Sequence, residues 1–239
     1  MAGMLTNLTT VASFAYKLAM SQLMLDHANH IAQELALPGK KPMLLAEVKT
    51  FVAHPDLDHD GKPEFRGTIT SSNFYFSFYE GQCWSIVRCN VFPSGAPYKF
   101  RDPLPHLAEL ARTPQTVTTN GAYSLATNWL TRFKVNIAET ERKYGKPSIY
   151  QLQYLSEKDE KLDTGFYYVQ WGPGSDGAVK VSLLGTTGEL MELNVYDKSL
   201  NHQPTLAITN WQELMATSER KLQKQSDGKT VKPSERSPK

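Results

Sequence analysis

Apolar side chains recur with helical spacing early in this chain and then with the spacing of strands. Met20, Met24, Ile31 and Leu35 fall on one side of a helix, which is predicted to end before the Pro-Gly pair at 38–39. The runs that follow are rich in valine, isoleucine and aromatic residues, which is typical of strands. These predicted strands span residues 43–53, 65–72, 74–79 and 82–92.

The same order of elements returns later in the chain. Asn120 is a suitable N-cap for a second amphipathic helix, whose apolar stripe includes Trp129 and Phe133, and Lys143 and Gly145 suit its C-terminal end. Four strand-like runs follow again, at 148–155, 165–171, 178–184 and 189–196. The sequence therefore predicts an internal duplication, and a repeated unit constrains the architecture more than any single motif.

We predict an α+β protein of two tandem units, each a helix packed on a four-stranded antiparallel meander. The predicted division is an N-terminal extension at 1–15, a first unit with its connector at 16–112, a second unit at 113–217 and a basic tail at 218–239. The connector is rich in proline, and short helices are predicted at 104–111 and 209–217. Because the tail has few apolar residues, we expect it to be disordered.

Aromatic residues fall on both faces of one predicted strand in each unit, at 74–79 and 166–171. Side chains alternate between the two faces of a strand, so one face buries its rings under the helix and the other leaves its rings uncovered. An uncovered aromatic face usually meets another surface. We expect the sheet of one unit to pack against the sheet of the other, with a second chain or a ligand as the alternatives.

The helix, the meander and the final hairpin with Gly-Glu-Leu-Met-Glu-Leu at 188–193 resemble the small repeats of PepSY and cystatin-like domains. The chain is similar to uncharacterised bacterial proteins that carry two such units, over residues 16–215. The resemblance implies an interaction or inhibitor-like module. Cystatin-like inhibitors plug a protease cleft with a Gln-x-Val-x-Gly hairpin, and the nearest phrase here, Gln151-Leu152-Gln153, has no glycine.

The sharpest local motif lies between the first two predicted strands. Its oxygen-bearing residues follow the alternate spacing of calcium-binding loops, and Gly61 stands where such loops turn sharply. The loop resembles those of EF-hands and FG-GAP-type repeats. We predict a Ca²⁺ site, with a solvated acidic loop as the alternative, because the corresponding loop at 157–163 is charged but lacks this spacing. The predicted ligands are Asp56, Asp58, Asp60, Lys62 (through its carbonyl) and Glu64.

A second arrangement of metal-binding residue types lies on the first helix. His27, His30 and Glu34 follow i, i+3, i+7 spacing and so share one helix face, where they are able to hold a transition metal. Solvated polar side chains beside a partly buried histidine are the simpler interpretation. The two cysteines, Cys83 and Cys89, lie too far apart on one extended strand to form a disulfide, so we predict unpaired thiols.

Net charge and hydropathy limit the partners and the cellular location that are expected for this chain. The net charge of +2 combines a tail of +4 (seven basic and three acidic residues at 219–239) with a body of −2, so no nucleic-acid partner is predicted. No apolar run is long enough to span a membrane. If a signal segment is removed before residue 1, the protein is secreted or periplasmic, and otherwise it is cytoplasmic.

No nucleophile elbow or phosphate-binding loop occurs in the sequence. We therefore predict a protein that is not an enzyme and that acts as an interaction or inhibitor-like module for a protein partner. The alternative is a small-molecule-binding protein or hydrolase whose site lies between the two units. A pocket with rings and convergent titratable groups favours that alternative, whereas a flat open sheet favours the interaction module.

Overall fold

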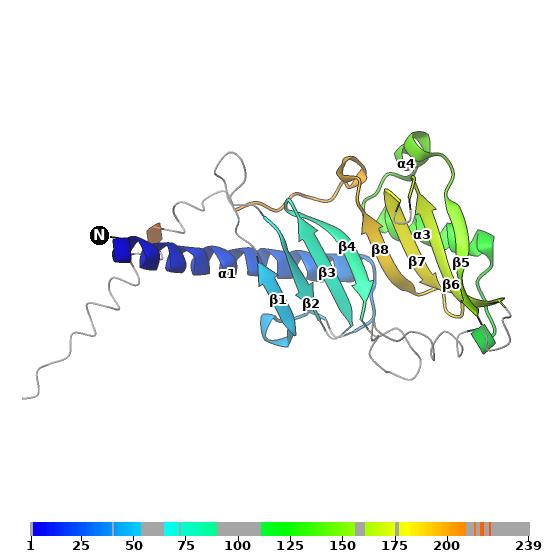
Figure 1. Cartoon of the computed structure of the whole chain (residues 1–239), viewed down its shortest axis with the longest axis horizontal. Helices are drawn as coiled ribbons and strands as arrows, with labels where there is room; N and C mark the ends of the chain where they lie inside the picture. The colour runs from blue at the N-terminus through cyan, green and yellow to red at the C-terminus, as the bar shows by residue number, and fades with distance from the viewer. Residues whose placement is uncertain are drawn as a thin grey trace, which may run out of the picture.

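The protein has an α+β fold built on one antiparallel sheet (Figure 1). Apart from isolated positions near the C-terminus, the computed structural model describes residues 2–39, 41–53, 65–71, 73–89, 111–155, 161–174 and 177–208. The first half contributes helix α1 (Ala2–Glu34), the 3-10 turn η1 (Leu45–Glu47) and strands β1–β4. The second half contributes α3 (Thr119–Arg132), α4 (Ile137–Tyr144), strands β5–β8 and the 3-10 turn η2 (Lys198–Leu200).

All eight strands belong to a single sheet with the order β1-β2-β3-β4-β8-β7-β6-β5. Each half is an antiparallel meander, and the halves join where β4 pairs with β8. We expected one sheet to pack face to face on the other, and the structure shows an edge-to-edge junction instead. The strands are β1 Thr50–Ala53, β2 Gly67–Thr70, β3 Phe74–Tyr79, β4 Gln82–Arg88, β5 Ser148–Leu155, β6 Lys161–Trp171, β7 Val179–Leu184 and β8 Leu190–Val195.

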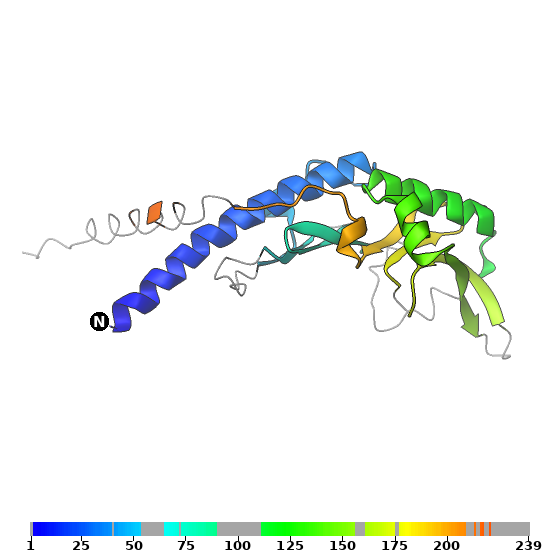
Figure 2. The ribbon, with the colours of Figure 1, turned by 90° about the horizontal axis from the view of Figure 1, so that it is seen from above.

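Helices α1 and α3 cover the same face of the sheet, end to end (Figure 2). One hydrophobic core lies beneath both and includes Met24 and Leu35 of α1, Leu130 of α3, and Phe76 and Val181 of the sheet. Because the strands alternate, the opposite face carries the other set of side chains. We call that second surface the open face.

The C-terminal ends of α1 and α3 meet above the junction. Two C-terminal ends carry partial negative charge, which basic side chains compensate. Arg132 donates from Nε to the carbonyl of Glu34 at 3.0 Å, and Lys134 forms an ion pair with the Glu34 carboxylate at 3.3 Å. These contacts hold the two helix ends together.

The aromatic strands divide their rings as the alternation predicted. Phe74, Phe76 and Phe78 are buried on the helix side, whereas Tyr75 and Tyr79 lie on the other face. In β6, Tyr167 and Trp171 are buried toward α3, and Phe166 and Tyr168 belong to the open face.

Several predicted elements have different bounds in the structure. The second helix is broken in two, because Lys134 adopts a left-handed conformation (φ 66°) and Asn136 then caps α4 by accepting from the Glu139 N–H at 3.1 Å. Only the last four residues of the predicted strand 43–53 pair as β1, since η1 interrupts the run. Thr118, rather than Asn120, is the N-cap of α3.

Helix α1 begins well before the amphipathic stretch, and its N-terminal part extends past the sheet (Figures 1 and 2). Although α1 has 33 residues, no helix in the described ranges combines the length and apolarity that a membrane span requires. Cys83 and Cys89 are unpaired, as their spacing predicted. Most of the connector, the predicted helix at 104–111 and nearly all of the tail lie outside the described residues.

Candidate functional site

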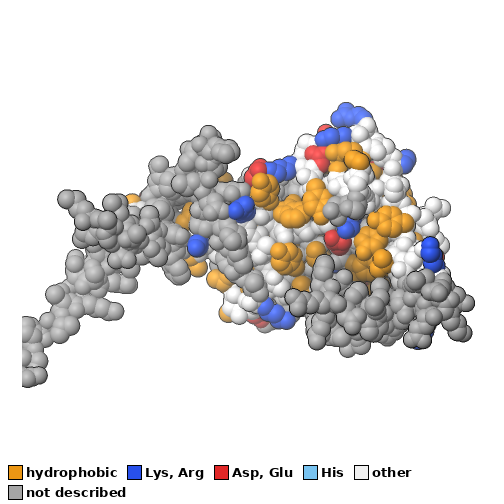
Figure 3. Space-filling model, viewed as in Figure 1, with side chains coloured by type: hydrophobic (Ala, Val, Ile, Leu, Met, Phe, Trp, Pro, Cys, Tyr) orange, Lys and Arg blue, Asp and Glu red, His pale blue; other side chains and the backbone are white. Residues whose placement is uncertain are grey.

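The open face combines aromatic and polar side chains at the junction of the two halves. The registers of the seven strand pairings define a continuous row of residues across all eight strands. Orange hydrophobic side chains lie over both halves in the space-filling view, with a few charged ones between them (Figure 3). From one sheet edge to the other, the row is Tyr150, Tyr168, Ser182, Glu192, Val87, Tyr75, Thr70 and Thr50.

A polar cluster, which we call the junction cluster, lies at the centre of this face and consists of Lys180, Ser182, Glu192 and Asn194. Lys180 Nζ lies 3.2 Å from Glu192 Oε2, and Ser182 Oγ donates to the same oxygen at 3.1 Å. Asn194 Nδ2 donates to Glu192 Oε1 at 2.6 Å. Both carboxylate oxygens of Glu192 are therefore already hydrogen-bonded, which suits a structural anion better than a free base.

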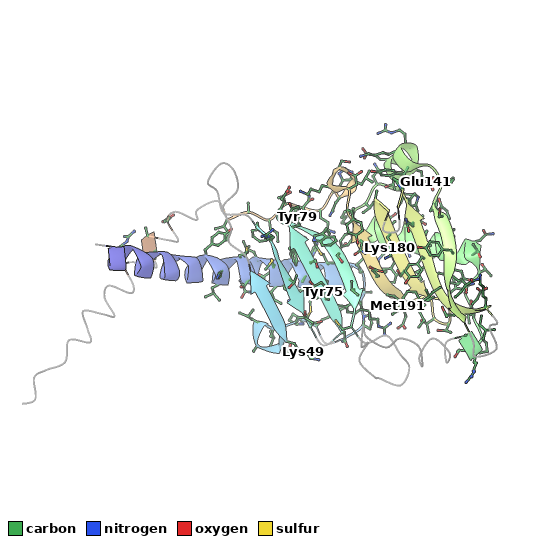
Figure 4. The ribbon with its side chains drawn as sticks, in the orientation of Figure 1. Lys49, Tyr75, Tyr79, Glu141, Lys180 and Met191 are labelled. Atoms are coloured by element: carbon green, nitrogen blue, oxygen red, sulfur yellow. The ribbon has the colours of Figure 1, made fainter. Side chains whose placement is uncertain are left out.

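The charged pair of the junction cluster is largely shielded from solvent. The side chains of Lys180 and Glu192 are 12% and 24% exposed. Lys180 Nζ also lies 5.3 Å from the centre of the Tyr168 ring, in a cation–π contact. Lys180 projects from the sheet on the viewer's side in Figure 4, the same side as Tyr75.

Asn194 carries a buried acceptor with no hydrogen-bond partner. Its Nδ2 faces the Glu192 carboxylate, so the amide oxygen must point the other way, because a flipped amide would place two acceptors together. The Oδ1 atom is buried and has no hydrogen-bond partner within the described part of the chain. A buried acceptor without a partner lowers the stability of the fold by about 1–3 kcal/mol. A ligand whose donor reaches this oxygen would recover that free energy on binding.

Next to the junction cluster is a hollow of about 270 Å³, here called the junction hollow. Trp84 and Tyr196 form one wall, with ring centres 5.2 Å apart. Tyr79 also lines the hollow, and Lys198 Nζ lies 4.3 Å from its ring centre. Lys198 is itself ion-paired with Glu80. The first half supplies Tyr79 and Trp84, and the second half supplies Tyr196 and Lys198, so the hollow exists only because the halves are joined.

The segment after β8 fixes the geometry of the hollow, and we call residues 198–208 the crossing segment. It leaves the second half and passes over the β3–β4 turn of the first (Figure 1). The Leu206 N–H donates to the Gly81 carbonyl at 2.7 Å, and Asn201 Nδ2 donates to the Cys83 carbonyl at 2.9 Å. Gly81 has a positive φ of 75°, and a Cβ there would lie 2.2 Å from the Leu206 carbonyl oxygen, so this crossing requires glycine.

His27 anchors the crossing segment to α1. Its Nε2 lies 3.0 Å from Gln203 Oε1, while Gln203 Nε2 donates to the Phe133 carbonyl at 3.1 Å. Burial lowers the pKa of His27, although the Gln203 hydrogen bond acts in the opposite direction. Burial therefore favours the neutral form of this packed imidazole.

Asp197, just before the crossing segment, is held as an anion. Desolvation acts to raise its pKa, but hydrogen bonds from Lys143, Tyr144 and Ser199 outweigh it and lower the pKa to about 2. Lys143 Nζ and Tyr144 OH lie 2.6 and 2.7 Å from Asp197 Oδ2. These contacts tie the end of β8 to α4.

The predicted metal ligands do not form a described site. Asp56, Asp58, Asp60, Lys62 and Glu64 all lie outside the described residues. His27 is buried against Gln203, and Glu34 pairs with Lys134, so these two side chains of the helix motif have separate partners. Among the described residues, no three histidine, cysteine or acidic side chains are arranged to hold a metal.

Sequence reasoning missed the junction cluster. Lys180 and Ser182 alternate with buried valines, and Glu192 and Asn194 alternate with Leu193, which is a signal for polar residues on one sheet face. In the β7–β8 hairpin, Lys180 pairs with Asn194 and Ser182 pairs with Glu192. The predicted meander already made these two strands neighbours. Their contact with the first half depends on the β4–β8 junction, for which no local signal exists.

Comparison with known proteins provides no assignment for this geometry. No protein-family model, curated protein or solved structure matches the chain. The resemblance to PepSY and cystatin-like repeats therefore stays a prediction from the residues, and the open face is the surface from which we infer a function.

Proposed function

We propose that this protein is a non-catalytic binding module that recognises a protein partner with the open face of its sheet. The observation that carries the proposal is the junction hollow with its aromatic wall, Trp84 and Tyr196, beside a charged pair that is already satisfied. Tryptophan and tyrosine dominate the energetics of protein interfaces because they bury large rigid surfaces. Tyr79 and Tyr196 are 40% and 42% exposed, so these rings are accessible.

The size of the hollow supports a protein partner rather than a whole small ligand. Small-molecule pockets usually measure about 300–1,000 Å³, and this one, at about 270 Å³, falls just below that range. A hollow of this size suits one anchoring side chain of a larger partner. Its rings favour an apolar or aromatic anchor, because Lys198 is already neutralised by Glu80.

The duplication is part of the same proposal. Each half presents a helix and a four-stranded meander in the same order, which supports a pair of cystatin-like or PepSY-like units. In this arrangement the interaction surface spans both units, since the hollow takes residues from each.

Selection of peptide ligands tests the proposal directly. A displayed peptide library is selected on the full chain, and each ligand is then measured against Trp84→Ala and Tyr196→Ala. We expect ligands with an apolar anchor that lose about 30-fold or more in affinity on either change, which corresponds to about 2 kcal/mol. The matched control is Leu44→Ala, an exposed apolar residue (51%) on the η1 segment. Ligands that bind all three variants equally would contradict the proposal.

A second candidate is a small-molecule site between the halves, favoured by the position of the hollow at their junction. A fragment screen followed by NMR shift mapping separates the two ideas. Fragments that bind at Trp84 and reach the Lys180–Glu192 pair would favour a small ligand. An absence of fragment binding alongside peptide binding would favour the protein partner.

A further inference from the structure

Strand β5 is the outermost strand of the second half, and its outer edge has no strand partner among the described residues (Figure 1). No backbone hydrogen bond in the described ranges joins β5 to any segment other than β6. Its eight residues contain no charged residue and no proline, which are the usual means of protecting an edge. The opposite edge strand, β1, has only four residues. Of the two edges, β5 is the one able to accept another strand.

The sequence of this edge reads the same in both directions. From Ser148 to Ser156 it is Ser-Ile-Tyr-Gln-Leu-Gln-Tyr-Leu-Ser, with Leu152 at the centre and one isoleucine–leucine exchange. Antiparallel pairing of two identical strands about a two-fold axis places residue i opposite its mirror position. Every residue from Ile149 to Leu155 is therefore placed opposite its own type or a close equivalent. Such matched pairs stabilise antiparallel sheets.

The backbone of β5 is suited to pairing about Leu152. Thr164 Oγ1 donates to the Leu152 carbonyl at 2.7 Å, so this carbonyl points toward β6. The irregularity in the β5–β6 register places three residues of β6 (164–166) against Leu152 alone, so β5 itself alternates regularly. The N–H and C=O groups of Gln151 and Gln153 consequently point outward, where pairing about Leu152 places them opposite each other.

The space beside β5 is open. A hollow of about 540 Å³ lies along the strand and is lined by Ile149, Gln151 and Gln153 together with Thr119 at the start of α3. On the open face, Tyr150 is 44% exposed and already stacks on Tyr168, with ring centres 5.3 Å apart. A strand added here extends a row of tyrosines that exists in the monomer.

We propose that β5 pairs with β5 of a second copy of this chain, about a two-fold axis at Leu152. Gln151 then exchanges backbone hydrogen bonds with Gln153 of the second copy, and Ile149 does so with Leu155, for about eight ladder bonds in total. The two eight-stranded sheets become one sheet. Because the axis is perpendicular to the sheet, both open faces lie on the same side. The dimer uses an edge distinct from the junction hollow, so it stands or falls separately from the proposed function.

The first test places charges on the two-fold axis. Leu152→Lys and Leu152→Glu each set two like charges directly opposite each other, so each variant alone should sediment as a monomer, whereas the wild type sediments as a dimer. An equimolar mixture of the two variants should recover the dimer mass. Circular dichroism confirms that each variant folds, and Leu45→Lys on η1, at a residue 37% exposed, is the control that should remain dimeric.

The second test reads the register through disulfide formation. Only a residue on the axis meets its own copy, and a non-hydrogen-bonded pair brings the two Cα atoms to about 4.5 Å, within disulfide range. Leu152→Cys should therefore cross-link into a covalent dimer under mild oxidation, whereas Gln151→Cys should not. A monomeric wild type, a charge mixture that stays monomeric while both variants fold, or equal cross-linking of both cysteine variants would overturn the proposal.

Discussion

The two halves have the same order of elements but are stabilised by different contacts. In the second half, polar side chains tie the helices to their surroundings: Tyr123 OH donates to Glu141 at 2.5 Å, and Lys143 and Tyr144 hold Asp197. In the first half, the long α1 is linked to the chain that follows mainly by Asn29, which pairs with both backbone groups of Met43 at 2.6 and 2.8 Å.

The first half also depends on the second half for the partner of its edge strand β4 and for the crossing segment that covers its β3–β4 turn. Strand β4 is paired on its far side by β8, and the crossing segment hydrogen-bonds to Gly81 and Cys83. A duplicated order of elements therefore does not mean two independent domains. Because the halves share one core and have contacts that cross the junction, we expect them to unfold together.

The largest expected effect tests that shared core. Phe76 is fully buried in the first half, and Phe76→Ala should lower the free energy of unfolding by about 3–5 kcal/mol. Because the core is continuous, chemical denaturation followed by Trp171 fluorescence, in a background whose other three tryptophans are replaced by phenylalanine, should shift by the same amount as the overall circular dichroism signal. Separate transitions would show that the second half folds alone.

The next effect concerns the crossing segment. Gln203→Ala removes the partner of His27 and of the Phe133 carbonyl, both within the buried hydrogen-bond network. Unmet buried groups of this kind should cost about 2–3 kcal/mol, measured by urea denaturation. His202→Ala, at the preceding residue, is the matched control. The His202 side chain is 54% exposed, so this substitution should change the free energy of unfolding little. Equal losses for both variants would show that the segment contributes only backbone contacts.

The predicted calcium loop is a further difference between the two halves, because only the first half has the ligand spacing in this loop. If Ca²⁺ binds the folded chain, the thermal midpoint should rise with added ion. At a free Ca²⁺ concentration ten times the dissociation constant, the free energy of unfolding should increase by about 1.4 kcal/mol. Asp58→Ala should abolish the rise, whereas Asp159→Ala in the corresponding loop of the second half should not. No shift at millimolar Ca²⁺ would exclude the site.

The smallest effect is a pH dependence at the contact between the halves. The pKa of His27 is lowered in the folded state, so the unfolded chain binds the extra proton first. The contribution of neutral His27 is complete above a pH of about 6.5, its unfolded pKa, and is lost as the pH falls through the folded pKa. His27→Gln should flatten the dependence of the thermal midpoint on pH in this window, as measured by calorimetry over a pH series. A variant that keeps the wild-type pH dependence would contradict this role of His27.

Local pattern predicted much of the fold. Alternation identified β5 at its observed bounds and predicted rings on both faces of β3 and β6, of which one set is buried. The prediction did not anticipate the break between α3 and α4, because the apolar stripe continues through Phe133 and the left-handed Lys134 has no sequence signal. Local patterns report the faces of individual elements, so they carry no information on which edges meet.

The amino-acid sequence alone predicted the α+β class and the unpaired cysteines, and it contains the palindrome of β5. The tertiary structure alone decided that the halves share one sheet and that Trp84 meets Tyr196 beside the junction cluster. The physical reason is that hydrophobic periodicity is a short-range property, whereas the β4–β8 pairing joins strands about a hundred residues apart. Such a junction is selected by the packing of the whole core.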